Sequence, residues 1–313
     1  MIADTNPTVT VGLPVFNGAR FVGQAIDSLL AQTGVDLELI VSDNGSTDDT
    51  ESICRAAAAM DDRVTYIRQA ENRGAAWNYN ELVRRARGRY FKWAAHDDLC
   101  APTFLQECVS AMEADPGIVL SYPRAIDVDE TGAAIRDYPS LTYAEQDRPV
   151  RRAWSALQNF TPCFESFGVV RTDALRDTQM IGAYASSDRT LFFELALRGR
   201  FHEVPAVLFF HRQHPDRSVF HRGGTRGRDS WFDPQRTLTH TSPRWRMAVQ
   251  HVHAVRAAPI SRHERALVYA MLTRLFVRYA RPLASESVEW MRARVGARWR
   301  RPTEQRAPRP QSS

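Results

Sequence analysis

The sequence predicts an α/β protein with a Rossmann-like, mostly parallel sheet flanked by helices and with a helical C-terminal extension. Two observations predict the sheet: strand-like and helix-like segments alternate over the first half of the chain, and their spacing is typical of strands connected by helical crossovers. A third observation predicts the extension, because the pattern beyond Trp245 becomes helical and rich in arginine. We expect one domain over residues 1–220, and a loop followed by basic helices over residues 221–313.

The N-terminal elements are predicted from hydrophobic periodicity. Thr8–Val15 is rich in β-branched residues, and Ala19–Gln32 carries its apolar residues on one helical face. Leu37–Ser42 is a continuous apolar run, typical of a strand buried on both faces, and Ser46 and Thr47 can cap the helix that follows. The series continues as strand, helix, strand and helix over Val64–Ile67, Trp77–Arg87, Arg89–Ala95 and from Pro102 onward.

The second half of the chain is less regular. We expect a strand at Ile118–Tyr122, an irregular stretch over residues 127–166 and a mobile polar loop over residues 214–233. Trp154 and Phe160 in the irregular stretch either contact substrate or simply pack. The remaining predicted elements are the strands Phe167–Arg171 and Val207–Arg212, a helix at Arg189–Leu197, and a terminal helix in which Leu267, Met271, Leu275 and Tyr279 recur every four residues.

Composition narrows the class of protein. The chain has 313 residues, 43% of them hydrophobic and 25% charged, which is ordinary for a globular protein. No run approaches the roughly 20 apolar residues of a membrane span, and the N-terminus lacks the pattern of a signal peptide, so we expect a cytoplasmic protein. Lys92 is the only lysine, and the four cysteines (Cys54, Cys100, Cys108 and Cys163) lack the spacing of a zinc site or a disulfide scaffold.

Charge is distributed unevenly along the chain. There are 41 basic and 36 acidic side chains in total, a formal charge of +5. Residues 244–313 contain 15 arginines and 4 glutamates, a net +11, which leaves 26 basic and 32 acidic residues, or −6, for the remainder. Arg274, Arg278 and Arg281 lie near one face of the predicted terminal helix, where they either face solvent or hold the protein peripherally on an anionic membrane. We expect no nucleic-acid partner, because aromatic residues do not interleave with these arginines in a recognisable module.

Polar residues follow four of the predicted strands at their carboxyl ends, where open α/β sheets bind ligands. The four segments contain Asn17, Asp43, Arg73 and the pair Asp97-Asp98. Adjacent carboxylates after a buried strand repel each other unless a cation or donor groups offset their charge. Such oxygen ligands suit Mg²⁺ or Mn²⁺ together with a diphosphate, although the pair could equally be an ordinary helix cap.

Four segments carry a resemblance to a known family: Val11–Asn17, Val41–Asp48, Asn72–Gly74 and His96–Asp98. In residues, order and spacing they resemble the inverting family 2 glycosyltransferases of GT-A fold, over about residues 8–220. The resemblance implies that the nucleotide sugar is bound by Pro14 (through its backbone), Asn17, Asp43, Arg73 and Asp97, and that Asp98 coordinates Mg²⁺ or Mn²⁺. His96 replaces the first aspartate of the family's acidic motif.

The resemblance also implies a general base. Asp188, just ahead of a predicted helix, takes the place of the family's catalytic acid, although Ser187 replaces the usual preceding glutamate. A carboxylate within about 3 Å of an acceptor hydroxyl can take its proton as the oxygen attacks the anomeric carbon. Without the resemblance, Asp188 would be interpreted as a helix N-cap. In the later strand and loop, His211 and His214 are candidate metal ligands and Arg212 is a candidate phosphate contact.

The predicted function is therefore metal-assisted, inverting transfer of a single sugar from a nucleoside-diphosphate sugar to a hydroxyl of a carbohydrate, lipid-linked or small-molecule acceptor. A sugar-nucleotide pyrophosphorylase or a dinucleotide oxidoreductase should open with a glycine-rich loop, but Leu13–Arg20 contains only Gly18. Processive synthases carry a Gln-x-x-Arg-Trp motif, and Arg244-Trp245 lacks its glutamine. The alternative, a catalytically degenerate glycosyltransferase-like binding module at the membrane surface, is motivated by His96 and Ser187.

Overall fold

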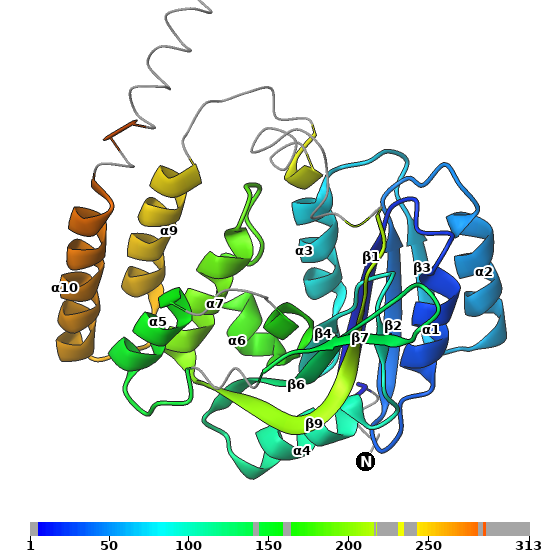
Figure 1. Cartoon of the computed structure of the whole chain (residues 1–313), viewed down its shortest axis with the longest axis horizontal. Coiled ribbons are helices and arrows are strands. Elements are labelled where there is room, and N and C mark those ends of the chain that lie inside the picture. Colours follow the sequence, from blue (N-terminus) through cyan, green and yellow to red (C-terminus); the bar gives the residue numbers. More distant parts are fainter. Residues whose placement is uncertain are drawn as a thin grey trace, which may run out of the picture.

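The computed structural model describes residues 6–139, 144–158, 164–215, 217, 231–234, 243–280 and 284–285. In this part of the chain a nine-stranded sheet is covered by helices on both faces (Figure 1). The strands are β1 Val9–Val15, β2 Leu37–Asp43, β3 Val64–Arg68, β4 Tyr90–Trp93, β5 Leu99–Cys100, β6 Ile118–Val128, β7 Ala134–Asp137, β8 Val169–Arg171 and β9 Arg200–Arg212. The helices are α1 Val22–Leu30, α2 Thr50–Met60, α3 Ala75–Arg85, α4 Phe104–Ala114, α5 Pro149–Gln158, the 3₁₀ helix η1 Phe164–Phe167, α6 Thr172–Arg176, α7 Ser187–Arg198, α9 Pro243–Ala257 and α10 Arg262–Arg278.

The sheet has a parallel half and a mixed half. The strand order is β3-β2-β1-β4-β8-β6-β9-β5, with β7 paired to β6. The strands β3, β2, β1 and β4 are parallel neighbours, and β6 is parallel to β9. In contrast, β8 runs antiparallel to β4 and β6, and β5 runs antiparallel to β9. The predicted α/β class with helices flanking the sheet is confirmed, and the parallel half brings the loops after β1, β2, β3 and β4 to one edge.

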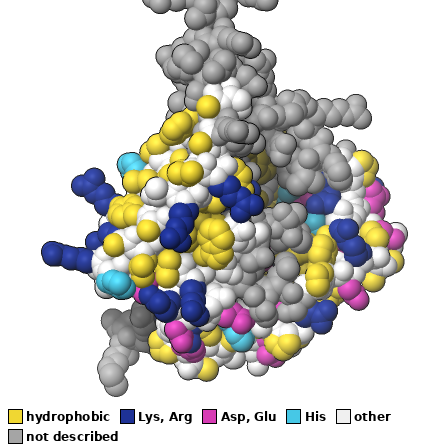
Figure 2. Space-filling view, turned by 60° about the vertical axis from the view of Figure 1, so that its left-hand side comes forward, with side chains coloured by type: hydrophobic (Ala, Val, Ile, Leu, Met, Phe, Trp, Pro, Cys, Tyr) yellow, Lys and Arg dark blue, Asp and Glu magenta, His cyan; other side chains and the backbone are white. Residues whose placement is uncertain are grey.

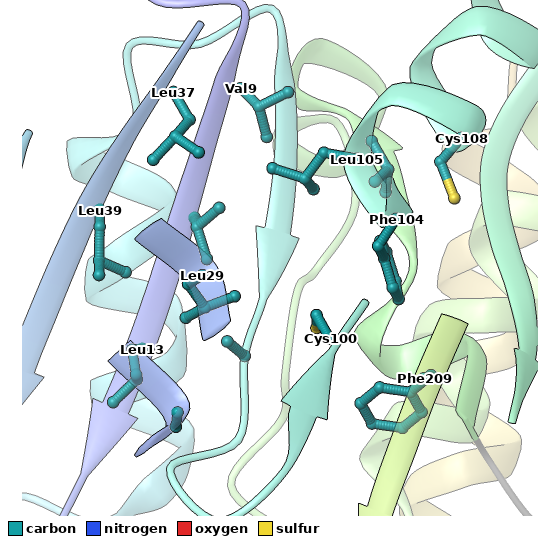
Figure 3. Packing of buried hydrophobic residues seen from close by; sticks show 14 of the residues in the cluster. Val9, Leu13, Leu29, Leu37, Leu39, Cys100, Phe104, Leu105, Cys108 and Phe209 are labelled. Atoms are coloured by element: carbon teal, nitrogen blue, oxygen red, sulfur yellow. The ribbon is translucent and has the colours of Figure 1, made fainter. Parts of the chain in front are cut away.

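The core explains why the N-terminal strands read as unbroken apolar runs. Every residue of β1 and β2 is buried, and their side chains meet those of α1 and α4, as Leu13, Leu29 and Phe104 illustrate (Figure 3). Lys92 on β4 is also buried, at 1% exposure. Its ammonium group donates hydrogen bonds to the carbonyls of Trp93 and Phe167, and burial lowers its pKa.

The prediction that residues 127–166 are irregular was wrong for most of the described part. Strand β6 continues to Val128, β7 pairs with it, and α5 follows. Periodicity missed β7 because all four of its residues are exposed. It missed α5 because the buried face of this helix consists of Arg152, Ala153 and Ala156, which carry little hydrophobic signal. Trp154 is 42% exposed on α5, and Phe160 lies outside the described residues.

The C-terminal helices α9 and α10 pack on the sheet domain through α5 and α7 (Figure 1). Ser261 caps α10, its hydroxyl accepting a hydrogen bond from the backbone N–H of Glu264 at 3.1 Å. The buried row of α10 is Val268 and Leu272, each one position beyond the predicted Leu267 and Met271. The predicted boundary between residues 220 and 221 lies outside the described residues, as does Arg281.

No helix in the described ranges is both long enough and apolar enough to cross a lipid bilayer.

Candidate functional site

Hydrogen bonds connect the loop after β1 to the loop after β2. Asn17 adopts a positive φ of 53°, a conformation that asparagine tolerates better than most residues. Its backbone N–H donates to Ser46 Oγ at 2.9 Å, and its Oδ1 accepts from the N–H of Thr47 at 2.8 Å. Pro14 is buried within β1, opposite Ser42 of β2. Asn17 is exposed at this edge of the sheet, whereas Pro14 is buried.

Asp43, the last residue of β2, is fully buried. Its Oδ1 accepts from the backbone N–H of Ser46 at 2.8 Å, and its Oδ2 accepts from the hydroxyl of Tyr66 at 2.7 Å. The Arg68 Nε lies 3.8 Å from the same Oδ2. Both oxygens of Asp43 thus have protein partners before any ligand binds, and the predicted contact with a nucleotide base stays a prediction.

Asn44 holds the Arg73 loop beside the end of β2. Its Oδ1 accepts from the backbone N–H of Arg73 at 3.0 Å, and its Nδ2 donates to Asn72 Oδ1 at 2.9 Å. The exposed Arg73 guanidinium stacks over the ring of Trp77, 3.9 Å from its centre. Such stacking on an aromatic face restrains the cation while leaving its other face and its edge available to a ligand.

Gly74 marks a close approach by the C-terminal part of the chain. Its φ is +87°, and a Cβ at this position would lie 2.4 Å from the carbonyl oxygen of Phe232. Hence Phe232 and Asp233 lie directly against the loop that carries Arg73. The sequence suggested only a mobile loop here, and no pattern in it indicated this contact.

The acidic loop after β4 lies beside the loop after β1. A Cβ on Gly18 would lie 2.6 Å from Cδ2 of His96, so glycine permits this contact. Asp98 is 6% exposed, and its Oδ1 accepts from the backbone N–H of Arg212 at 2.9 Å. Asp97 Oδ2 and His214 Nε2 are 2.9 Å apart. The end of β9 and the residues directly after it therefore supply both contacts, Arg212 to Asp98 and His214 to Asp97.

The pKa values of Asp97 and Asp98 are shifted in opposite directions. Burial and the neighbouring Asp97 raise the pKa of Asp98 well above its usual range. Burial also acts on Asp97, but the charge of His96 and the hydrogen bond from His214 outweigh it and lower the pKa of Asp97. Two carboxylates that cannot ionise together without cost form a site that a cation would stabilise. However, the described residues contain no group of three or more His, Cys, Asp or Glu side chains placed to hold a metal ion.

His214 and His211 have different surroundings. His214 is buried against the ring of Phe21, and its Nδ1 has no hydrogen-bond partner among the described residues. His211 instead bonds through Nδ1 to Asp127 Oδ1 at 2.9 Å, and its Nε2 lies 2.9 Å from the Arg217 guanidinium. No described contact joins His211 to Asp98. The metal role predicted for His211 therefore has no support in these contacts, whereas that of His214 is compatible with them.

The side chain of Arg212 is buried and hydrogen-bonded within the protein, rather than exposed as a free cation would be. It is 1% exposed, and its guanidinium donates to the carbonyls of Asp97 and Glu130 and to Gln24 Oε1 at 2.7–2.9 Å. The guanidinium also lies 4.5 Å from the centre of the Phe21 ring. A direct phosphate contact by Arg212 stays a prediction, since in this structure the side chain holds the acidic loop in place.

Asp188 lies in the first turn of α7, after Ser186, which adopts a positive φ of 66°. The loop before it is tied to α3, because Asn80 Nδ2 donates to the carbonyl of Ile181 and Asn80 Oδ1 accepts from its N–H. Next to Asn80 is Tyr79, whose pKa is raised by burial and by the negative charges of Asp97, Asp98 and Asp188. Tyr79 thus lies within electrostatic range of each of these three carboxylates. Sequence reasoning missed Tyr79, which does not stand out from the composition of its helix. It included Asn44 in the segment Val41–Asp48 but gave this residue no role of its own.

The comparisons with known proteins agree with this geometry. The sequence model described as glycosyl transferase family 2 matches residues 10–177. An uncharacterized glycosyltransferase of Rickettsia prowazekii is 36% identical over 107 residues, which cover 34% of this chain and 32% of that protein. The chondroitin synthase of Escherichia coli is 32% identical over 129 residues, 41% of this chain and 19% of the synthase. The matched region therefore spans a third or less of either relative.

Solved structures share the fold. S. aureus TarS in complex with UDP superposes with a TM-score of 0.61 at 15% identity, over 86% of this chain and 72% of that chain. The mannosyltransferase PcManGT from Pyrobaculum calidifontis, in complex with GDP-Man and Mn²⁺, superposes with a TM-score of 0.51 at 19% identity, over 95% of this chain and 88% of that chain. At such identities the likeness establishes the architecture.

Proposed function

This chain belongs to glycosyl transferase family 2, and from that premise we propose that it is an inverting transferase that moves one sugar from a nucleoside-diphosphate sugar to an acceptor hydroxyl. One observation carries the proposal. The loops after β1, β2 and β4 and the Arg73 loop meet at one edge of the sheet, joined by the contacts of Asn17, Asn44 and Gly18. The family match does not favour the alternative of a degenerate binding module.

The donor would bind along this edge. Asn17 and Arg73 are exposed there, and Arg73 is restrained by Trp77, so these two side chains are the ones available for direct contact. Asp43 and Pro14 lie beneath them and would shape the pocket for the base. The UDP of TarS and the GDP-Man of PcManGT support the donor class for this fold.

A divalent cation, Mg²⁺ or Mn²⁺, fits the acidic loop. Burial and the neighbouring Asp97 raise the pKa of Asp98, so a cation would stabilise its ionised form. His214, whose Nε2 lies 2.9 Å from Asp97 Oδ2, keeps a buried Nδ1 that has no hydrogen-bond partner among the described residues. We assign Asp98 as the principal protein ligand, with His214 as a second candidate and with the donor's phosphates as further ligands, as is usual for Mg²⁺. When bound, the cation would stabilise the charge on the departing diphosphate.

Asp188 is assigned the role of general base. Its carboxylate would accept the proton of the acceptor hydroxyl while that oxygen forms a bond to the anomeric carbon and the bond from this carbon to the diphosphate oxygen breaks. A single displacement inverts the anomeric configuration. Support comes from the position of Asp188 in the first turn of α7 and from its charge acting on Tyr79 together with those of Asp97 and Asp98. Transfer of a single sugar is supported by the missing glutamine before Arg244-Trp245.

The proposal is tested with the purified protein and a panel of UDP-, GDP- and dTDP-sugars, each with Mn²⁺ or Mg²⁺. We expect one donor to raise the melting temperature, since a ligand at 100 times its Kd stabilises the folded state by about 2.7 kcal/mol. The transferred or released sugar should have the inverted anomeric configuration by NMR. Asp98→Asn should abolish the metal dependence of the shift, whereas Asp62→Asn, at an exposed turn, should preserve it. If no donor is bound or hydrolysed with either metal, the proposal is wrong.

A further inference from the structure

Residues of α9 and α10 line a groove. In Figure 1 these two helices lie on the left, whereas strands β1, β2 and β3 lie on the right. The volume of the groove is about 570 Å³, and its lining is apolar except for His253 and Thr273. The apolar lining includes Trp245, Val249 and Val252 from α9 and Phe276 and Val277 from α10.

Apart from Phe276, which also packs against the buried cluster between the helices, these apolar side chains are exposed. The inner faces of both helices already pack against α5 and α7 through residues such as Val255 and Leu272. On the groove side, Val277 is 71% exposed, Val249 49% and Trp245 46%. The two helices therefore have a second apolar face that nothing in the described chain covers. Contiguous exposed apolar surface of this kind marks a site of interaction.

The charge around the groove limits what can cover it. Residues 245–280 contain six arginines and a single carboxylate, Glu264, which pairs with Arg148. Arg274 and Arg278 follow the groove residues Thr273 and Val277 directly in sequence, so they lie on the adjacent row of the helix. Both are exposed, and among the described residues neither takes part in an ion pair. Figure 2 shows this end of the molecule, where hydrophobic side chains gather between arginines.

We propose that the α9–α10 groove docks the protein on an anionic lipid bilayer. The groove's valines and Trp245 would enter the headgroup region, and Arg274 and Arg278 would contact lipid phosphates, which is the pattern of interfacial helices. A second copy docking through the same face would place these unpaired arginines against each other and would be opposed by their repulsion. Bilayer binding needs neither donor nor metal, so the proposal stands apart from the assigned transferase activity.

The test is vesicle co-sedimentation of the full chain without donor. We expect binding to phosphatidylcholine vesicles that contain about 30% phosphatidylglycerol, little binding to pure phosphatidylcholine, and a marked loss in about 0.5 M NaCl. The double variant R274Q/R278Q should bind about 30-fold more weakly, from roughly fivefold for each arginine at an anionic surface. The double variant V249S/V277S should lose about tenfold, because two valines no longer enter the apolar layer.

Matched controls lie on the opposite part of the fold. R84Q/R85Q on α3 removes the same charge from side chains that are about as exposed, and Met60→Ser on α2 removes an even more exposed apolar side chain. Both should bind within about twofold of the unchanged protein, because neither position touches the docking face. Unchanged melting temperatures would show that all variants fold.

Three results would overturn the proposal. The first is an absence of binding to anionic vesicles. The second is binding that the groove variants leave unchanged, which would assign it to the arginines beyond residue 280. The third is a dimer in light scattering that V249S/V277S dissociates, which would assign the groove to a second copy.

Discussion

The side chains at the sheet edge differ from those on the outer side of α9 and α10 in whether they have partners within the described part of the protein. At the sheet edge, Asp43, Asp98 and Arg212 are buried, and each already has protein hydrogen-bond partners. On the outer side of α9 and α10, apolar side chains are exposed, and Arg274 and Arg278 form no ion pair within the described part of the chain. A preorganised polar edge suits a small polar ligand, because little has to move when it binds. A surface that combines exposed apolar side chains with cations suits a binding partner outside the chain.

The largest expected effect is catalytic and belongs to the sheet edge. Replacing Asp188 by Asn should lower the transfer rate by about 10²–10⁴, the usual contribution of a general base. Donor binding, followed by the shift in melting temperature, should persist, because Asn keeps the size of the side chain. Initial rates with the best donor of the panel provide the measurement. A variant with normal rates would remove Asp188 from this role. Asp173→Asn serves as the control, because Asp173 is likewise an acidic residue in the first turn of a helix, α6.

A second effect tests whether the polar edge contributes to stability. Arg212→Leu should lower the free energy of unfolding by about 3 kcal/mol or more, because the carbonyls of Asp97 and Glu130 lose the donor that the buried guanidinium provides. Urea denaturation at neutral pH measures this. Arg278→Leu is the matched control on the exposed side of α10 and should change stability by less than about 0.5 kcal/mol. Equal losses in the two variants would contradict the comparison between the regions.

A third pair of variants separates the two faces of α10. Leu272→Ala should cost about 2–5 kcal/mol, because it leaves a cavity where Leu272 packs at 1% exposure. Val277→Ala, at 71% exposure, should cost nearly nothing, since alanine has the higher helix propensity. Thermal unfolding of both variants is the measurement. A large loss from Val277→Ala would mean that another part of the chain covers the groove.

The smallest expected effect concerns the contact between α9 and α7, where the C-terminal helices pack on the rest of the fold. His251 of α9 packs on the ring of Phe193 of α7, and burial together with the charge of Arg189 lowers its pKa from 6.5 to about 4. The unfolded chain therefore binds a proton more readily than the folded one, so stability falls as the pH drops from about 6.5 toward 4. Between pH 7 and pH 5 this histidine should account for about 2 kcal/mol.

Urea denaturation at the two pH values measures this loss. His251→Leu should show a smaller decrease than the unchanged protein, while His253→Gln, exposed on the same helix, should show the full decrease. An identical decrease in all three proteins would exclude His251 as its source.

Much of the sheet edge follows from the sequence, because buried parallel strands are continuous apolar runs and the polar residues after them mark one edge. The segments around Asn17, Asp43, Arg73 and Asp98 were found in this way, and the family match confirms the resemblance that they carry. What the sequence could not indicate is which side chains face one another. The burial of Arg212 and the partnership of His211 with Asp127 depend on strand pairing between β6 and β9, which lie far apart along the chain.

The C-terminal helices were predicted in kind but not in orientation. Leu267 and Met271 belong to the four-residue apolar repeat that predicted this helix, whereas the buried residues are Val268 and Leu272. Both rows are apolar, so periodicity alone cannot tell the core face from an exposed one. The same ambiguity hid the groove, whose apolar residues appear in the sequence as further core.

The isolation of Lys92 has a practical consequence. The chain carries a single ε-amino group, enclosed between β4 and η1 by the carbonyls of Trp93 and Phe167. An acylating reagent can modify it only when these two elements separate. The rate at which Lys92 is acylated can be followed by peptide mapping. This rate would therefore measure how often the centre of the sheet opens, without any engineered label.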